Sequence, residues 1–193
     1  MTTRKMLPIG VENFEQIRKD DCYYIDKTAF IAELLSSKFA VNLITRPRRF
    51  GKTLTMSMLE CFFNIRKDNG LLFDGLKIME FPDICDEWLN KWPVLFITFK
   101  DLAMRNFANS YEQFAFVVSS LCVEHAYLRE SDKVEQSDKE FFARLETRTA
   151  TETEVRNSLF VLMRMLHAHY GKQVILLIDE YDVTLAKANE FDY

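Results

Sequence analysis

Glycine is scarce in this chain. Only 5 of its 193 residues are glycine, less than half of the usual share of about 7%. Dinucleotide-binding folds place three glycines in one short turn, so this composition argues against a glycine-rich site of that kind. Any phosphate-binding loop in this chain has to work with few glycines.

Long apolar runs are also missing. The longest uninterrupted ones, at 159–163 and 174–178, fall far short of the roughly 20 residues that cross a bilayer. The basic start of the chain is not followed by the apolar stretch of a secretory signal. We therefore expect a cytoplasmic protein that has no membrane partner.

Clustered metal ligands are absent as well. The four cysteines form no C-x-x-C pair and have no histidine at zinc spacing, and His167 and His169 are two apart, on different helix faces. This pattern predicts reduced, mostly buried thiols and no zinc site. The cysteines are Cys22, Cys61, Cys85 and Cys122.

What the chain does contain is typical of one globular domain, or of a domain with a small appendage. Hydrophobic residues make up 48% of the chain and charged residues 28%, which is too apolar for disorder. Its 25 basic and 29 acidic residues give a net charge of −4. The whole chain is therefore not a basic nucleic-acid coat.

Helical patterns alternate with short apolar runs. Buried strands are predicted at 39–45, 93–99 and 173–178, and helices at 27–36, at 52–63 and after three capping boxes that start at Ser110, Ser137 and Thr151. Gly171 is predicted to end the last helix, and 64–91 to be irregular. Continuous apolar strands separated by helices indicate a parallel sheet covered on both faces, and hence the α/β class.

The turn between the first strand and the next helix ends in Gly-Lys-Thr. Gly51 lets the backbone approach a phosphate at a helix N-terminus, Lys52 supplies a charge for the β- and γ-phosphates, and the Thr53 hydroxyl can bind Mg²⁺. The match to G-x-x-x-x-G-K-[ST] is imperfect, because Arg46 replaces the first glycine. An ordinary joint with a solvated basic tip is the alternative. The residues predicted to bind the nucleotide are Arg46, Pro47, Arg48, Arg49, Phe50, Gly51, Lys52 and Thr53.

A phosphate loop of this type requires an acidic residue at the end of another buried strand. The strand at 173–178 runs directly into Asp179 and Glu180. Asp179 is predicted to hold Mg²⁺ through water, and Glu180 to polarise the attacking water. Lys52 and Glu180 are therefore the predicted catalytic residues, and Thr53 and Asp179 the predicted metal ligands.

With both motifs, the chain resembles the predicted AAA-ATPase-like family of bacterial proteins. The likeness covers essentially the whole chain and rests on residues 7–10 with Phe14, 23–28, 46–53 and 177–182. It implies a P-loop NTPase of the additional-catalytic-glutamate division, with a three-layer α/β/α core and a mainly parallel sheet. Arginine at position 46 is the usual form in that family. Many relatives continue into a restriction-endonuclease-like nuclease domain, so a downstream nuclease-like domain and nucleic acid are possible partners, although nothing in these 193 residues shows a nuclease activity.

The resemblance also bears on completeness. Similar NTPases order their sheet 5-1-4-3-2, and strand four carries a sensor residue. If the three predicted strands are strands one, two and three, then strand four, the sensor and any arginine finger would lie beyond Tyr193. We therefore expect these residues to be the N-terminal part of a longer protein, with a helical clasp at 1–38 and part of the NTPase core at 39–193.

Three functions are consistent with these motifs. The first is Mg²⁺-dependent binding and hydrolysis of ATP, which is preferred over GTP because no N-K-x-D motif is present. The second is a nucleotide-binding sensor or scaffold without turnover. The third is a nucleic-acid-binding module that uses Arg46, Arg48 and Arg49. The stretch 23–28 has no assigned chemistry: it either packs on the core or lines an adenine pocket.

Overall fold

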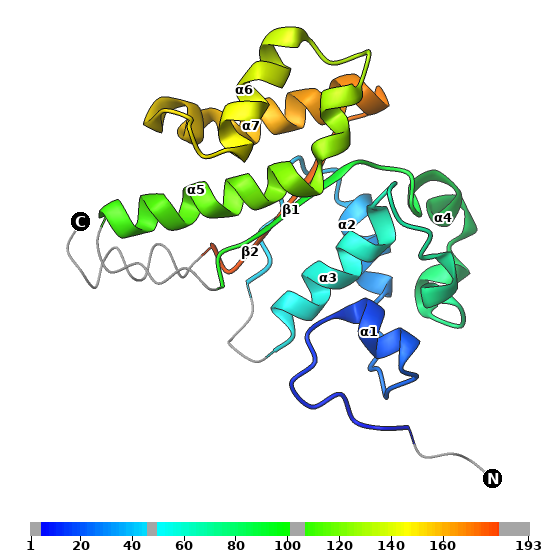
Figure 1. Cartoon of the computed structure of the whole chain (residues 1–193). Coiled ribbons are helices and arrows are strands. Elements are labelled where there is room, and N and C mark those ends of the chain that lie inside the picture. Colours follow the sequence, from blue (N-terminus) through cyan, green and yellow to red (C-terminus); the bar gives the residue numbers. More distant parts are fainter. Residues whose placement is uncertain (1–4, 46–49, 101–106, 182–193) are drawn as a thin grey trace. The chain divides into compact units, whose positions relative to one another are not determined.

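The computed structural model describes residues 5–45, 50–100 and 107–181 of the chain (Figure 1). The chain divides into two compact units, Met1–Val94 and Leu95–Tyr193. Each unit contains its own set of buried apolar side chains.

The first unit is built mainly from helices. Its elements are α1 (Phe14–Lys19), α2 (Ala29–Ser36), α3 (Lys52–Phe63), the 3₁₀ turns η1 (Gly70–Phe73) and η2 (Lys77–Glu80), and α4 (Pro82–Trp88). α1 packs against α3 and η1, while α2 and α4 each contact η2. Pro82 starts α4, a position where a missing N–H costs nothing. Sequence analysis predicted 64–91 to be irregular and so missed this short helix.

Aromatic rings form the core of the first unit. Phe14, Phe62 and Phe73 are fully buried, and the Phe73 ring lies 5.0 Å from Phe14 and 5.3 Å from Phe62. Tyr24 packs edge-to-face on Phe14 at 5.3 Å. The rings join the N-terminal segment to α3, so helices of the predicted clasp at 1–38 lie in the same compact unit as α3. The predicted boundary after residue 38 stays a prediction.

The second unit combines three long helices with a small parallel sheet. Its elements are β1 (Val94–Thr98), which begins at the last residue of the first unit, α5 (Phe107–Glu124), η3 (Ala126–Glu130), α6 (Gln136–Glu146), α7 (Glu152–Tyr170) and β2 (Ile175–Asp179). The two strands are hydrogen-bonded to each other. Figure 1 shows α5 running across them, with α6 and α7 packed against α5.

Apolar side chains from every layer meet in the core of this unit. Leu95 and Ile97 of β1 pack in one cluster with Leu121 of α5, Phe142 of α6 and Leu162 of α7. Helices packed on parallel strands agree with the predicted α/β class. The described residues form only two strands, so the three-layer arrangement stays a prediction.

Several predicted elements are confirmed. The helix predicted at 52–63 is α3, and the capping box at Thr151 opens α7, where the Thr151 N–H donates to the Glu154 carboxylate at 2.8 Å. Gly171 ends α7 with φ 67°, a left-handed conformation that glycine adopts without strain. The Ser137 box is not formed, because α6 begins one residue earlier, at Gln136.

The predicted strand at 39–45 is wrong. These residues form no strand, and Phe39, Val41 and Leu43 are 73%, 86% and 67% exposed. The apolar composition predicted burial, but a strand also needs a neighbour for its N–H and C=O groups. None of the described strands pairs with this segment.

A charged pair joins α6 to α7. Asp138 is buried and accepts two hydrogen bonds from Arg164, one of them 2.8 Å from Nε, and these bonds raise the pKa of Arg164. Helix α7 carries a second charged pair, Arg156 with Glu152, in which both side chains are at least half exposed. Arg164 and Arg156 therefore differ mainly in their partner, because Asp138 is buried and Glu152 is exposed.

We expect Arg164→Met to lower the free energy of unfolding by about 1–3 kcal/mol, because it leaves a buried carboxylate without its partner. Arg156→Met, the matched control, should change it by less than about 0.5 kcal/mol. Urea unfolding monitored by circular dichroism measures both variants. Equal losses in the two variants would contradict this reading of the pair.

Candidate functional site

The start of α3 carries four of the predicted site residues. Gly51 is the N-cap of the helix, with φ 75° and ψ 32°, a left-handed conformation that favours glycine. Its carbonyl accepts hydrogen bonds from both the backbone N–H and the hydroxyl of Thr55, each 2.9 Å long. These bonds fix the turn through which the chain enters the helix.

This end of the helix has the properties of an anion site. Its N-cap residue is glycine, which has no side chain to cap the first N–H groups. The first N–H groups of a helix lack partners within the helix, and its dipole places partial positive charge there. Lys52 and Thr53 are half-buried in this first turn, and Phe50 beside it is 62% exposed. The residues suit the phosphate-binding role predicted for them.

Little surrounds the Gly51 backbone. A Cβ at Gly51 would lie 3.8 Å from the Nζ of Lys27, with no other described heavy atom outside the adjacent residues within 4 Å. The backbone is thus open to a ligand on this side, and Lys27 is the nearest side chain. Arg46, Pro47, Arg48 and Arg49, also predicted to bind the nucleotide, lie outside the described residues.

The end of β2 carries the predicted acidic pair. Asp179 is only 2% exposed, and its Oδ2 is buried without a hydrogen-bond partner among the described residues. Its backbone carbonyl accepts a 3.1 Å hydrogen bond from the N–H of Phe99. A buried carboxylate oxygen without a partner is rare and suits an absent cation or water. The donor chemistry at Asp179 therefore fits Mg²⁺.

Glu180 follows with an unusual backbone. Its φ of 56° is left-handed, which costs an L-residue other than glycine about 1–2 kcal/mol. Strain of this kind is concentrated at functional sites. Its side chain is half-buried, and the chain leaves the strand at this residue.

The predicted residues thus form two groups. Gly51, Lys52 and Thr53 lie together in the first unit, and Asp179 and Glu180 lie together in the second. Sequence reasoning missed Lys27 as a neighbour of the glycine turn. Its only signal was the unassigned stretch at 23–28.

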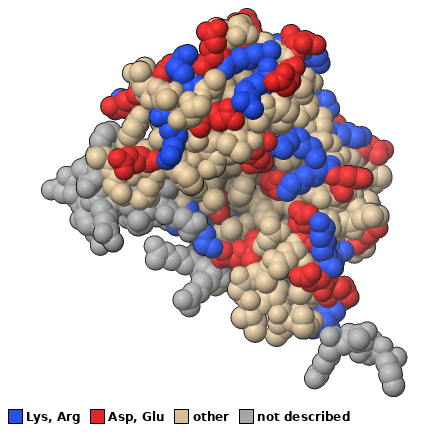
Figure 2. Space-filling view, in the orientation of Figure 1, with Lys and Arg blue, Asp and Glu red and all other residues tan. Residues whose placement is uncertain are grey.

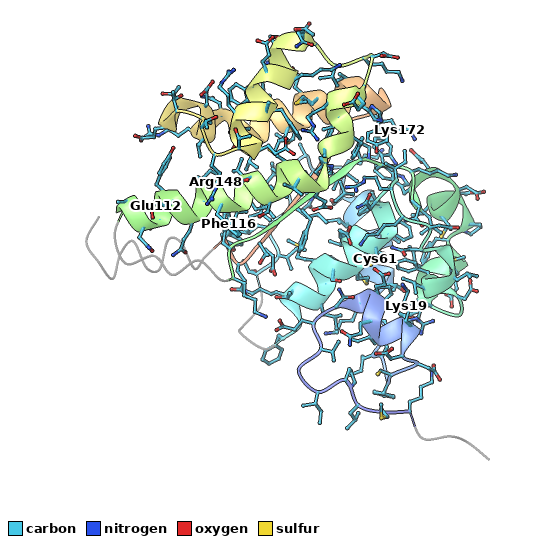
Figure 3. The ribbon with its side chains drawn as sticks, in the orientation of Figure 1. Lys19, Cys61, Glu112, Phe116, Arg148 and Lys172 are labelled. Atoms are coloured by element: carbon cyan, nitrogen blue, oxygen red, sulfur yellow. The ribbon has the colours of Figure 1, made fainter. Side chains whose placement is uncertain are left out.

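One cavity in the described part of the second unit holds none of these residues. It has a volume of about 500 Å³ and lies between β1 and α5, where Phe96 and Phe116 line it. Figure 3 shows Phe116 and Glu112 on α5. The walls are mainly apolar, so this cavity offers no phosphate-binding chemistry.

Other site types find no support in the described residues. No cluster of three or more His, Cys, Asp or Glu side chains is placed to hold a metal. All four cysteines are buried and free, as predicted, and burial raises the pKa of Cys61 and Cys122 to about 12. None of the described helices is both long and apolar enough to span a membrane.

Charges of both signs mix on the surface. On the face shown in Figure 2, acidic and basic side chains alternate over α6 and α7. This pattern differs from the continuous basic stripe that tracks a nucleic-acid backbone.

Comparison with known proteins identifies one family for this chain. The model of the family described as "Predicted AAA-ATPase" matches residues 8–192. The chain is also 33% identical over 181 residues to a protein of Azotobacter chroococcum mcd 1 described as "Uncharacterized protein in vnfD 5'region". That match covers 93% of this chain and 30% of the relative, so the chain spans less than a third of the relative's length. No solved structure matches the chain.

Proposed function

Because the chain belongs to the predicted AAA-ATPase family, we propose that it binds ATP with Mg²⁺ and hydrolyses it. The observation that supports this most directly is the start of α3, where the N-cap Gly51 is left-handed and Lys52 and Thr53 follow. Family membership implies a nucleotide, and this helix end supplies N–H groups and a lysine charge for its phosphates.

Each residue has a chemical role in the proposal. Lys52 neutralises the β- and γ-phosphates, and the Thr53 hydroxyl is a direct ligand of Mg²⁺. Asp179 would hold Mg²⁺ when the ion is bound, and Glu180 would accept a proton from the attacking water. When bound, Mg²⁺ supplies charge neutralisation for the phosphates.

The finer fold belongs to the same proposal. We propose a three-layer P-loop core of the additional-catalytic-glutamate division, in which Glu180 is that glutamate. Arg46, Arg48 and Arg49 add guanidinium groups to the phosphate loop in place of the missing first glycine. A nuclease-like domain elsewhere in a longer protein stays a prediction.

The test is the affinity of the chain for ATP in the presence of Mg²⁺. We expect Lys52→Met to weaken binding at least tenfold, since hydrogen bonds to charged groups contribute about 1.5–3 kcal/mol. Lys19→Met is the matched control: Lys19 is an exposed lysine of α1 in the same unit, paired with Glu15 (Figure 3). Isothermal titration calorimetry measures all three proteins.

Other outcomes separate the alternatives. Equal affinity in wild type and Lys52→Met would contradict the proposed site. Binding without any turnover would support the sensor and remove the hydrolytic half of the proposal. Steeply salt-dependent DNA binding that does not respond to Lys52→Met would favour the nucleic-acid module.

A further inference from the structure

The stretch at 23–28 alternates between two environments. Tyr24, Asp26 and Thr28 face the protein and are partly or fully buried, whereas Tyr23, Ile25 and Lys27 are exposed. This period of two is that of an extended segment with one side on the core. The inward residues therefore serve packing, and the outward ones are available for another purpose.

Asp26 and Thr28 anchor the segment on both sides of Lys27. Asp26 Oδ1 accepts hydrogen bonds from the N–H and the hydroxyl of Thr28, at 2.8 and 2.7 Å, and its Oδ2 accepts one from the Lys77 N–H at 2.8 Å. The Thr28 hydroxyl oxygen accepts a further bond from Ile78. Burial alone would raise the pKa of Asp26, but the hydrogen bonds from Thr28 and Lys77 outweigh it and hold the pKa below its usual value.

Tyr24 ties the same segment to α3. Its hydroxyl donates to the sulfur of Met58 at 3.4 Å. Burial raises the pKa of Tyr24 to about 12. The segment that carries Lys27 is therefore held on η2 by Asp26 and Thr28 and on α3 by Tyr24.

This scaffold brings a second lysine to the phosphate turn. The Lys27 Nζ lies 3.8 Å from where a Cβ of Gly51 would be, and Gly51 is the N-cap of α3 and directly precedes Lys52. Within the described residues, the Lys27 ammonium is in no ion pair and no hydrogen bond. An exposed cation placed at a positively polarised helix end is electrostatically unfavourable unless an anion joins it.

We propose that Lys27 is a second phosphate-binding lysine, whose ammonium contacts the phosphate chain of the nucleotide bound at Gly51–Thr53. The inference rests on the nucleotide site proposed above and gives the stretch at 23–28 its role. Asp26 and Thr28 are positioning residues, and Lys27 is the residue that contacts the ligand. The ligand class is a nucleoside polyphosphate, and the nucleobase plays no part in this contact.

Binding measurements on the whole chain test the proposal. Lys27→Met is expected to weaken ATP binding about tenfold while changing AMP binding by less than about twofold, because AMP lacks the distal phosphates. Lys27→Arg keeps the charge and should stay within about threefold of wild type. Lys19→Met is the control, and an unchanged unfolding midpoint shows that each variant folds, as expected for exposed positions.

A chemical footprint gives a second readout. ATP is expected to slow the acetylation of Lys27 by an amine-reactive ester in wild type and not in Lys52→Met, as followed by mass spectrometry. The inference is overturned if Lys27→Met binds ATP as Lys19→Met does, or if it loses ATP and AMP equally. Loss of ATP binding in Lys52→Met alone would overturn the role of Lys27 and leave the proposed function intact. A wild type that binds no ATP would overturn both.

Discussion

Glu180→Gln is expected to bind ATP as wild type does and to hydrolyse it about 100- to 10,000-fold more slowly. A positioned general base typically contributes a factor of this size. Glutamine keeps the shape and hydrogen-bonding reach of glutamate but accepts no proton from the attacking water. Binding is retained because the phosphate contacts belong to Lys52 and Thr53 in the proposed site.

The backbone at Glu180 supports this role. At φ 56°, glutamate lowers the stability of the folded chain more than glycine or asparagine would at the same position. Glu180 directly follows Asp179, whose buried carboxylate lacks a partner at Oδ2. The left-handed backbone of Glu180 and the unpartnered Oδ2 of Asp179 both disfavour folding. A shared role in the proposed site would account for both features at the end of one strand.

Single-turnover and steady-state phosphate release measure the effect. The control is Glu140→Gln, which removes an exposed carboxylate from α6 in the same unit and should leave turnover unchanged. A second variant, Glu180→Gly, is expected to lose turnover equally while being no less stable, because glycine adopts this backbone without strain. Turnover within threefold of wild type in Glu180→Gln would assign the general base elsewhere.

Short sequence motifs correctly predicted the helix ends that neighbouring residues determine. The Gly-Lys-Thr turn predicted the start of α3, because glycine before a helical pattern specifies the left-handed entry at Gly51. Thr151 with Glu154, and Gly171 after the last periodic residue, predicted the two ends of α7 for the same reason. Each signal involves residues no more than four apart.

Features that depend on distant residues were not predictable in this way. The apolar segment at 39–45 reads as a strand, but strand formation depends on a neighbour elsewhere in the chain, which composition does not reveal. Lys27 and Gly51 are 24 positions apart, and they meet only because the segment that carries Lys27 is held on η2 by Asp26 and Thr28 and on α3 by Tyr24. The burial of Asp179 without a partner is likewise visible only once the second unit is packed.

Asp179→Asn is expected to have two opposite effects. The nucleotide-free protein should gain about 1–3 kcal/mol in its free energy of unfolding, because a buried carboxyl group whose Oδ2 has no hydrogen-bond partner among the described residues is replaced by an amide. The affinity for Mg²⁺ in the presence of ATP should fall about 10- to 100-fold, the usual cost of losing an outer carboxylate of a metal site. Urea unfolding in EDTA measures the first effect, and Mg²⁺ titration of ATP binding measures the second.

Asp138→Asn is the matched control, because Asp138 is also a buried aspartate of the same unit but has both carboxylate oxygens hydrogen-bonded to Arg164. It is 5% exposed and paired with Arg164, so its loss should destabilise the protein and leave the Mg²⁺ affinity unchanged. If the free energy of unfolding rises in Asp179→Asn and falls in Asp138→Asn, then Asp179 is kept at a cost to stability, as expected for a residue that serves a ligand. If Asp179→Asn destabilises the protein as Asp138→Asn does, then Asp179 has a structural partner and its proposed metal role loses its support.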